Sequence, residues 1–114
     1  MWESKPLNLE SDLYFVDKPK FLLGYIALAK KFKRKLFTNE EARLYLIDLF
    51  KKRIPVYGGT KENRTPANIY YIRGLLEKER ISESLIYYRV KSSIRKKIMD
   101  ELKKTDYLIY LNQL

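Results

Sequence analysis

The stretch ISESLIYYRVKSSIRKKIMDELKKTDYLIYL, residues 81–111, decides the fold that the sequence predicts. Ser82 is a candidate N-cap for a short helix over residues 83–89, and Ser92 is one for a second helix over residues 93–104. A serine hydroxyl in this position accepts a hydrogen bond from a first-turn N–H group that has no partner within the helix. We therefore expect two helices joined by a tight turn.

The second of these helices has an apolar side and a basic side. Ile94, Ile98 and Leu102 recur every four residues, which builds one apolar stripe along a helix. The solvated face carries five cations, at Arg95, Lys96, Lys97, Lys103 and Lys104. Residues 107–111 are aromatic, aliphatic and β-branched, and they predict a short strand after the helix.

One unbroken helix over residues 83–104 is the alternative interpretation. Apolar residues keep a spacing of four through both segments, which a continuous helix would place on one face, at Ile86, Val90, Ile94, Ile98 and Leu102. The two interpretations differ in whether the chain turns near Val90.

An apolar helix, a short helix, a basic helix and a strand in this order resemble the winged helix-turn-helix superfamily of DNA-binding domains. The similarity covers residues 66–111, and IYYIRGLL at residues 69–76 is similar to the first helix of that family. Ile81–Ser82 matches the start of the second helix, and Val90 matches the apolar residue that the turn buries.

The resemblance implies that residues 93–104 form a recognition helix in the major groove of duplex DNA, with residues 107–111 near the backbone. Position supports this role, because the cations at residues 95–97 lie early in the helix, where the helix dipole disfavours them. Contact with a phosphate or a base edge would explain that placement. The candidate nucleic-acid-binding residues are Lys91, Ser92, Ser93, Arg95, Lys96, Lys97, Arg89 and Lys103.

The net charge of +10 over 114 residues also indicates a polyanionic partner. The first 17 residues hold one base and four acids, so the positive charge lies in the rest of the chain. Nucleic acid is the commonest intracellular polyanion, and an anionic membrane surface or an acidic protein is the alternative. We predict a double-stranded DNA-binding protein, a transcriptional regulator or a replication accessory.

We expect an acidic arm over residues 1–18 and a single basic helical domain over residues 19–114. In the arm, residues 13–16 predict a strand with residues 107–111 as its candidate partner, and an irregular arm packed on the core is the alternative. In the domain, a helix begins at Pro19 and continues over residues 20–35.

Two more helices are expected in the middle of the chain. Thr38 and Glu41 form a capping box for a helix that ends near Lys52. Thr65 and Pro66 start a helix over residues 66–79. The predicted fold is therefore mainly α, with about five helices, a minor β element and a winged-helix-like C-terminal half.

The helix over residues 20–35 is apolar around most of its circumference. Such a helix must be buried in the core or by a partner. A second hypothesis follows, in which the protein is a helical interaction subunit or homodimer that docks through Phe21–Phe32. A third hypothesis is a single-stranded DNA or RNA binder, in which Tyr70, Tyr71, Tyr87 and Tyr88 stack on bases. Packing at the edge of the core is the alternative role for these tyrosines.

Cysteine and histidine are both absent, which removes the common nucleophiles, general bases and zinc ligands. The GGTKENR loop at residues 58–64 lacks the Walker spacing. We therefore predict no enzymatic activity, no metal and no cofactor.

The sequence has no membrane-spanning or secretion pattern. The longest nearly apolar run covers residues 21–29, whereas a transmembrane helix needs about 20 residues. With no apolar leader near the start, we expect a soluble cytoplasmic protein. Many charges and few thermolabile residues suit a thermophile, or a virus or plasmid of one.

Overall fold

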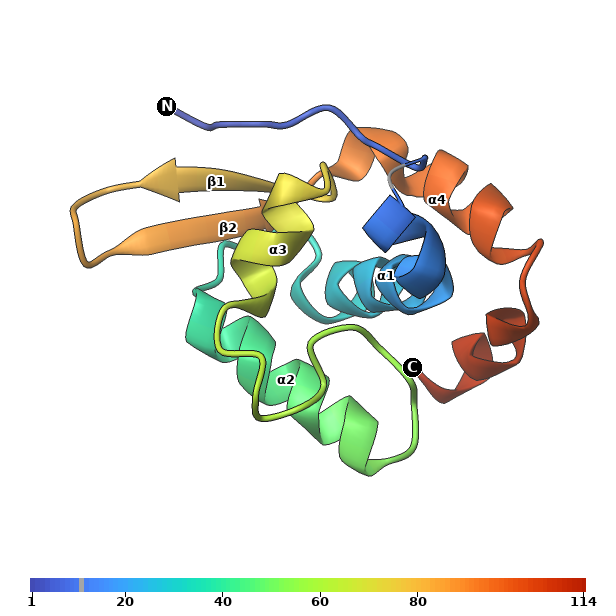
Figure 1. Ribbon diagram of the computed structural model, residues 1–114. Helices are drawn as coiled ribbons and strands as arrows, with labels where there is room; N and C mark the ends of the chain where they lie inside the picture. The colour runs from blue at the N-terminus through green and yellow to red at the C-terminus, as the bar shows by residue number, and fades with distance from the viewer. Residues whose placement is uncertain (11) are drawn as a thin grey trace.

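The computed structural model describes residues 1–10 and 12–114, with the backbone alone for residues 12–14 (Figure 1). The elements follow in the order α1 (Asp12–Phe32), α2 (Asn39–Lys51), α3 (Pro66–Ile72), β1 (Leu76–Arg80), β2 (Ile86–Val90), η1 (Ser92–Ile94), α4 (Arg95–Leu102) and η2 (Asp106–Gln113), where η marks a 3₁₀ helix. The described chain is mainly helical with one two-stranded antiparallel sheet, which confirms the predicted class at that level.

α1 forms the centre of the core. Every residue from Phe21 to Ala29 is buried, and β2, α4 and η2 pack against this helix. Each large apolar side chain that is buried in this way contributes about 1.5–3 kcal/mol. The Phe21–Phe32 surface is therefore covered by the chain itself, and the hypothesis that a partner or a second copy docks on it is wrong.

A glycine allows α1 and α3 to approach closely. A Cβ atom on Gly24 would lie 1.7 Å from the hydroxyl oxygen of Tyr70. The Tyr70 hydroxyl donates a 2.8 Å hydrogen bond to the backbone carbonyl of Tyr57, which fixes the ring between the helix and the loop before α3. Any other residue at Gly24 would displace the Tyr70 ring from this position.

The start of α1 differs from the prediction. The helix begins at Asp12, so the strand expected over residues 13–16 is wrong, although the side chains of residues 13 and 14 lie outside the described set. The expected pairing partner, residues 107–111, lies in η2 and forms no strand. Pro19 lies inside α1 instead of at its first turn, and the helix crosses the boundary drawn between residues 18 and 19.

The capping box at the start of α2 is confirmed. The backbone N–H of Glu41 donates to the Thr38 hydroxyl at 3.2 Å, and the Thr38 N–H donates to the Glu41 carboxylate at 3.1 Å. Both bonds satisfy donors that have no partner within the helix. α2 ends at Lys51, one residue before the expected end.

The region expected to form helices after residue 72 is a β-hairpin. α3 ends at Ile72, and Gly74, with φ +82°, turns the chain into β1. β1 pairs with β2 so that Leu76 lies opposite Val90 and Lys78 opposite Tyr88. The helix expected over residues 66–79 is therefore too long, and the helix expected over 83–89 is wrong, as is the unbroken helix over 83–104.

The spacing of four in Ile86 and Val90 explains the error. Four residues are about one helical turn, but they are also two full strand repeats, so the spacing fits both structures. The strand buries Tyr88 and Val90, and the alternate residues Tyr87 and Arg89 are less buried. The hydroxyl of Ser82, expected to cap a helix, instead accepts the N–H of Leu85 in the hairpin turn.

Both strands have a further neighbour. Phe37 exchanges two backbone hydrogen bonds with Tyr88 of β2, and Glu3 exchanges two with Lys78 of β1. In Figure 1 the N-terminal segment runs along β1 on the side away from β2. These contacts tie the hairpin to the body, while its turn projects outward.

The C-terminal region keeps the predicted apolar stripe. Ile98 and Leu102 of α4 have no exposed surface, and Ile94 packs against the core from the end of η1. The strand expected over residues 107–111 is wrong, because these residues lie in η2, whose first turn is capped by the Thr105 hydroxyl. None of the helices in the described part of the chain has the length and hydrophobicity needed to cross a bilayer.

Candidate nucleic-acid interface

Six of the eight predicted binding residues lie exposed on and beside α4. We call this set the α4 surface, and it consists of Ser92, Ser93, Arg95, Lys96, Lys97 and Lys103. All of them except Lys97 line a shallow hollow of about 560 Å³ together with Met99 and Asp100. The amphipathic pattern of α4 causes this arrangement, because burial of Ile98 and Leu102 turns the basic side to solvent.

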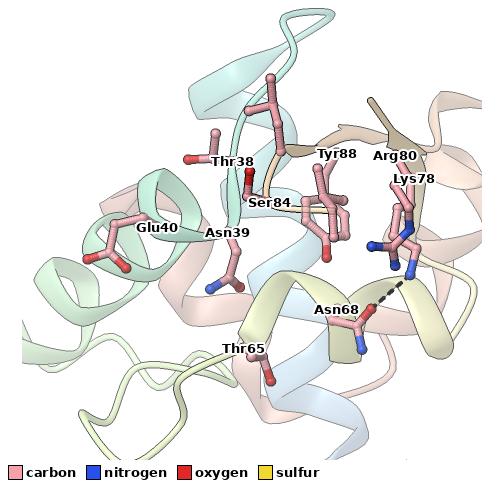
Figure 2. Close-up of a pocket in the computed structure, with 11 residues that line it drawn as sticks. Thr38, Asn39, Glu40, Thr65, Asn68, Lys78, Arg80, Ser84 and Tyr88 are labelled. Carbon is pink, nitrogen blue, oxygen red and sulfur yellow. Dashed lines mark hydrogen bonds between the residues drawn. The ribbon is translucent and has the colours of Figure 1, made fainter. Parts of the chain in front are cut away.

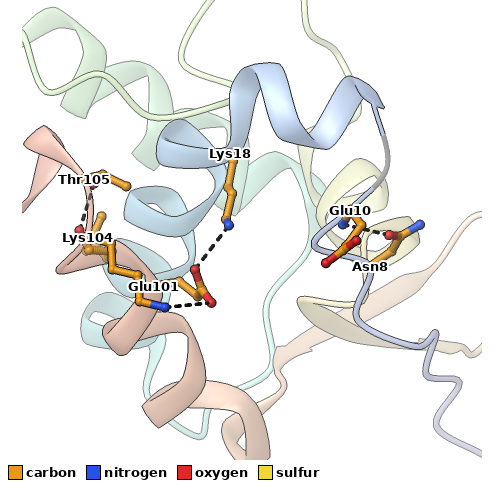
Figure 3. A network of polar contacts seen from close by, with 7 residues as sticks. Asn8, Glu10, Lys18, Glu101, Lys104 and Thr105 are labelled. Carbon is orange, nitrogen blue, oxygen red and sulfur yellow. Dashed lines mark hydrogen bonds and ion pairs between the residues drawn. The ribbon is translucent and has the colours of Figure 1, made fainter.

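The α4 surface is held by contacts between α4 and α1. The Lys18 ammonium lies 3.2 Å from the Glu101 carboxylate, and Figure 3 shows Lys18 and Lys104 both directed at Glu101. The hydrogen bond from Lys18 holds the pKa of the Glu101 carboxyl below its usual range. At the other end, the Tyr25 hydroxyl donates a 2.6 Å hydrogen bond to the Lys91 carbonyl. Burial raises the pKa of Tyr25 to about 12.

The other two predicted binding residues have structural partners. Arg89 pairs with Glu77 across the hairpin, with 2.9 Å between Nε and Oε1, and its guanidinium lies 4.1 Å from the centre of the Trp2 ring. The Lys91 ammonium donates a hydrogen bond to the backbone carbonyl of Lys5, and burial lowers its pKa. Both side chains anchor the N-terminal segment, and neither belongs to the α4 surface.

A second surface, which the sequence did not predict, lies between α2, α3 and the hairpin. We call it the hairpin groove, and its volume is about 580 Å³. Figure 2 shows Lys78 and Arg80 side by side on one wall, with Asn68 on α3 and Thr65 just before this helix. The groove is lined by Thr38, Asn39, Glu40, Thr65, Asn68, Lys78, Arg80, Ser84, Leu85, Ile86 and Tyr88.

Polar contacts fix the shape of the hairpin groove. The Asn39 side chain accepts the N–H of Ala67 at 3.1 Å and donates to the Arg64 carbonyl at 2.8 Å, so it joins the first turns of α2 and α3. The Lys78 ammonium donates to the Asn68 side-chain oxygen at 3.3 Å and lies 4.4 Å from the centre of the Tyr71 ring. The two helices and the hairpin therefore hold one another in position.

Three side chains of the groove offer a ligand three different kinds of polar group. Arg80 is exposed and offers a planar set of donors suited to phosphate. Asn68 offers an amide and Thr65 a hydroxyl on the α3 side. The same groove also contains the carboxylate of Glu40, which pairs with Arg43 at 3.3 Å.

The sequence missed this groove because residues 66–79 were expected to be one helix. Within such a helix, Asn68, Lys78 and Arg80 would not converge with a hairpin. Gly74 was the available signal, since a glycine after an apolar helix marks a frequent end point.

The tyrosines expected either to stack on bases or to pack at the core take the second role in three of four cases. Tyr70, Tyr71 and Tyr88 are buried, and Tyr87 is half-buried on β2. Burial also raises the pKa of Tyr88. These four tyrosines therefore do not form an exposed platform on which bases could stack.

Within the described residues, acidic side chains form no cluster that could hold a metal ion. Comparison of the chain with protein-family models, with curated proteins and with solved structures gives no match.

Proposed function

We propose that this protein binds double-stranded DNA, as a transcriptional regulator or replication accessory, and that the hairpin groove faces the duplex. One observation carries the proposal. The start of α3 and the cationic wall formed by Lys78 and Arg80 border a single open groove. A short helix beside two hairpin cations, Lys78 and Arg80, offers both a reader for base edges and contacts for phosphates.

The order of the elements supports a winged-helix arrangement over residues 12–90 instead of 66–111. Three helices, α1 to α3, are followed by the hairpin of β1 and β2. Phe37, in the segment of chain that joins α1 to α2, pairs with the outer side of β2. In this proposal α3 replaces residues 93–104 as the helix that enters the major groove. The turn at residues 81–85 is then the tip of the wing.

The side chains of the groove fit these two roles. Asn68 presents an amide donor to a base edge, while its oxygen accepts from Lys78, and Thr65 can donate to or accept from a base or a phosphate. Arg80 supplies a charged contact to the backbone. The connection over residues 52–65 is longer than the turn of a compact helix-turn-helix, so α2 and α3 are held together by Asn39 instead.

Duplex binding by two groove variants and one control tests the proposal. Arg80→Ala is expected to weaken binding to all duplexes and to make the plot of log K against log salt less steep by about 1. Asn68→Ala is expected to lose about 1–3 kcal/mol at one base position and little elsewhere. Lys51→Ala removes a charge from the far end of α2 and is expected to change affinity little.

Fluorescence anisotropy with a panel of duplexes, a single strand and an RNA gives all of these values. The proposal predicts that duplex DNA binds more tightly than single-stranded DNA or RNA of equal length. It is overturned if Arg80→Ala and Lys51→Ala behave alike, because the groove would then make no specific contribution.

A further inference from the structure

A strongly basic surface remains outside the hairpin groove. Helix α4 and the hairpin lie at opposite sides of the view in Figure 1, and the body measures 40 Å along its longest axis. We propose that the α4 surface is a second binding site for the phosphate backbone of duplex DNA and that it is independent of base sequence. For its ligand, this inference rests on the proposed function.

The cations of the α4 surface, like most lysines and arginines in the described part of the chain, have no carboxylate partner. Lys18 and Lys104 both contact Glu101, and Arg89 contacts Glu77. Within the described residues, no ion pair includes a cation of the α4 surface, whose members are Arg95, Lys96, Lys97 and Lys103. Asp100 is the acid in the same hollow, so several positive charges face one negative charge.

The position of three of these cations also indicates an external anion. Residues 95–97 occupy the first turn of α4, where the helix dipole disfavours positive charge. The basic clusters at the ends of α1 and α2, at residues 30–31 and at Lys51, lie where the dipole favours cations. Helix stability therefore accounts for those two clusters but not for the one on α4.

The chemistry of the α4 surface suits backbone contact more than base recognition. Long, flexible ammonium and guanidinium groups and two serine hydroxyls are the usual donors to phosphate oxygens. The surface contains neither asparagine nor glutamine, the side chains that pair with adenine. α4 itself is fixed to α1 by Ile98 and Leu102, so the cations are presented from a rigid support.

Two sites on separate sides would allow one molecule to hold two segments of DNA. The groove would recognise one segment, and the α4 surface would hold a neighbouring segment or a second duplex by charge alone. Affinity for long DNA would then exceed affinity for a duplex that reaches only one site.

The test compares two double variants that remove equal charge. Arg95→Ala/Lys96→Ala changes the α4 surface, and Lys30→Ala/Lys31→Ala is the control at the end of α1. Salt-dependent anisotropy is measured on three unrelated duplexes long enough to reach both sites. The α4 variant is expected to raise the dissociation constant by one common factor and to make the salt slope less steep by about 2, because two phosphate contacts are lost. The control is expected to change neither quantity by a similar amount.

The outcomes separate this inference from the proposed function. If Arg80→Ala weakens binding and the α4 variant matches its control, the α4 inference is overturned and the groove proposal stands. If the α4 variant alone weakens binding, the inference stands and the groove is not the duplex site. A loss confined to one base position would mean that α4 reads sequence, which contradicts a backbone contact. Absence of duplex binding by the unmodified protein at low salt would overturn both.

Discussion

The hydroxyl of Tyr25 on α1 donates a 2.6 Å hydrogen bond to the backbone carbonyl of Lys91, the residue that leads from β2 into η1. Tyr25 has no exposed surface, so this bond links the centre of the core to the junction between the hairpin and α4. The two surfaces proposed to bind DNA therefore share one internal anchor.

Tyr25→Phe removes this bond without changing the shape of the ring. We expect it to lower the free energy of unfolding by about 1 kcal/mol near neutral pH, because the Lys91 carbonyl loses its partner. Chemical denaturation followed by circular dichroism measures the change. An unaltered midpoint would show that the bond does not contribute to stability.

The free energy of unfolding of the same variant should also differ from that of the unmodified protein at alkaline pH. The pKa of Tyr25 is about 12 in the folded protein and 10.0 as its ordinary value, so the folded state keeps the proton longer than the unfolded state. The stability from this group is fully present below pH 10 and is lost as the pH rises toward 12. The advantage in unfolding free energy of the unmodified protein over Tyr25→Phe should therefore shrink and then reverse over that range. A constant difference would contradict the raised pKa.

Lys18→Met tests the contact between α1 and α4 through its effect on stability at neutral and acidic pH. The Lys18 hydrogen bond lowers the pKa of Glu101, so its stabilising effect is present above the ordinary carboxyl pKa and is lost as the pH falls through the lowered value. We expect Lys18→Met to cost less than about 1 kcal/mol at pH 7, since the pair is partly exposed.

The cost should disappear at acidic pH, once Glu101 is protonated in both proteins. Lys20→Met, an exposed change on the same helix, is the control for the lost charge. Equal costs at both pH values for Lys18→Met would show that the ion pair is not the cause.

Leu28→Asp and Leu44→Asp place the same charge in opposite surroundings. Leu28 on α1 is fully buried, whereas the Leu44 side chain on α2 is 57% exposed. An unpaired carboxylate in the core costs several kcal/mol, so Leu28→Asp should unfold the domain or prevent its soluble expression. Leu44→Asp should stay folded with little change in melting temperature. A folded Leu28→Asp variant would contradict the placement of α1 at the centre of the core.

Removing cations from the first turn of α4 should not weaken the fold. Arg95→Ala and Lys96→Ala are expected to leave the melting temperature unchanged or slightly raised, since the helix dipole disfavours these charges. Lys30→Ala, in the last turn of α1, should lower it slightly for the opposite reason. Thermal denaturation of the three variants compares them directly. A marked loss in Arg95→Ala would assign that side chain a structural role instead of a binding role.

The sequence predicted the elements whose signals are local. The capping box of Thr38 and Glu41 and the stripe of Ile98 and Leu102 depend on residues within one or two turns, and both are present in the structure. Exposure of the basic side of α4 followed from the same stripe.

The hairpin could not be predicted from such signals. Ile86 and Val90 satisfy helical and strand spacing equally, and the choice depends on distant residues. Tyr88 forms backbone hydrogen bonds with Phe37, which lies far earlier in the chain, and Lys78 forms them with Glu3. These long-range contacts stabilise the strands, and with the hairpin misassigned the groove beside it was missed as well.

Salt dependence of duplex binding tests DNA binding most directly. If about six phosphates are contacted, log K against log salt should fall with a slope of about −0.9 per contact, or roughly −5 overall. The measurement needs the unmodified protein, one duplex and a series of salt concentrations followed by anisotropy. A slope near −5 is the result predicted here. A slope shallower than about −2, or no binding at low salt, would contradict the proposal that this protein binds DNA.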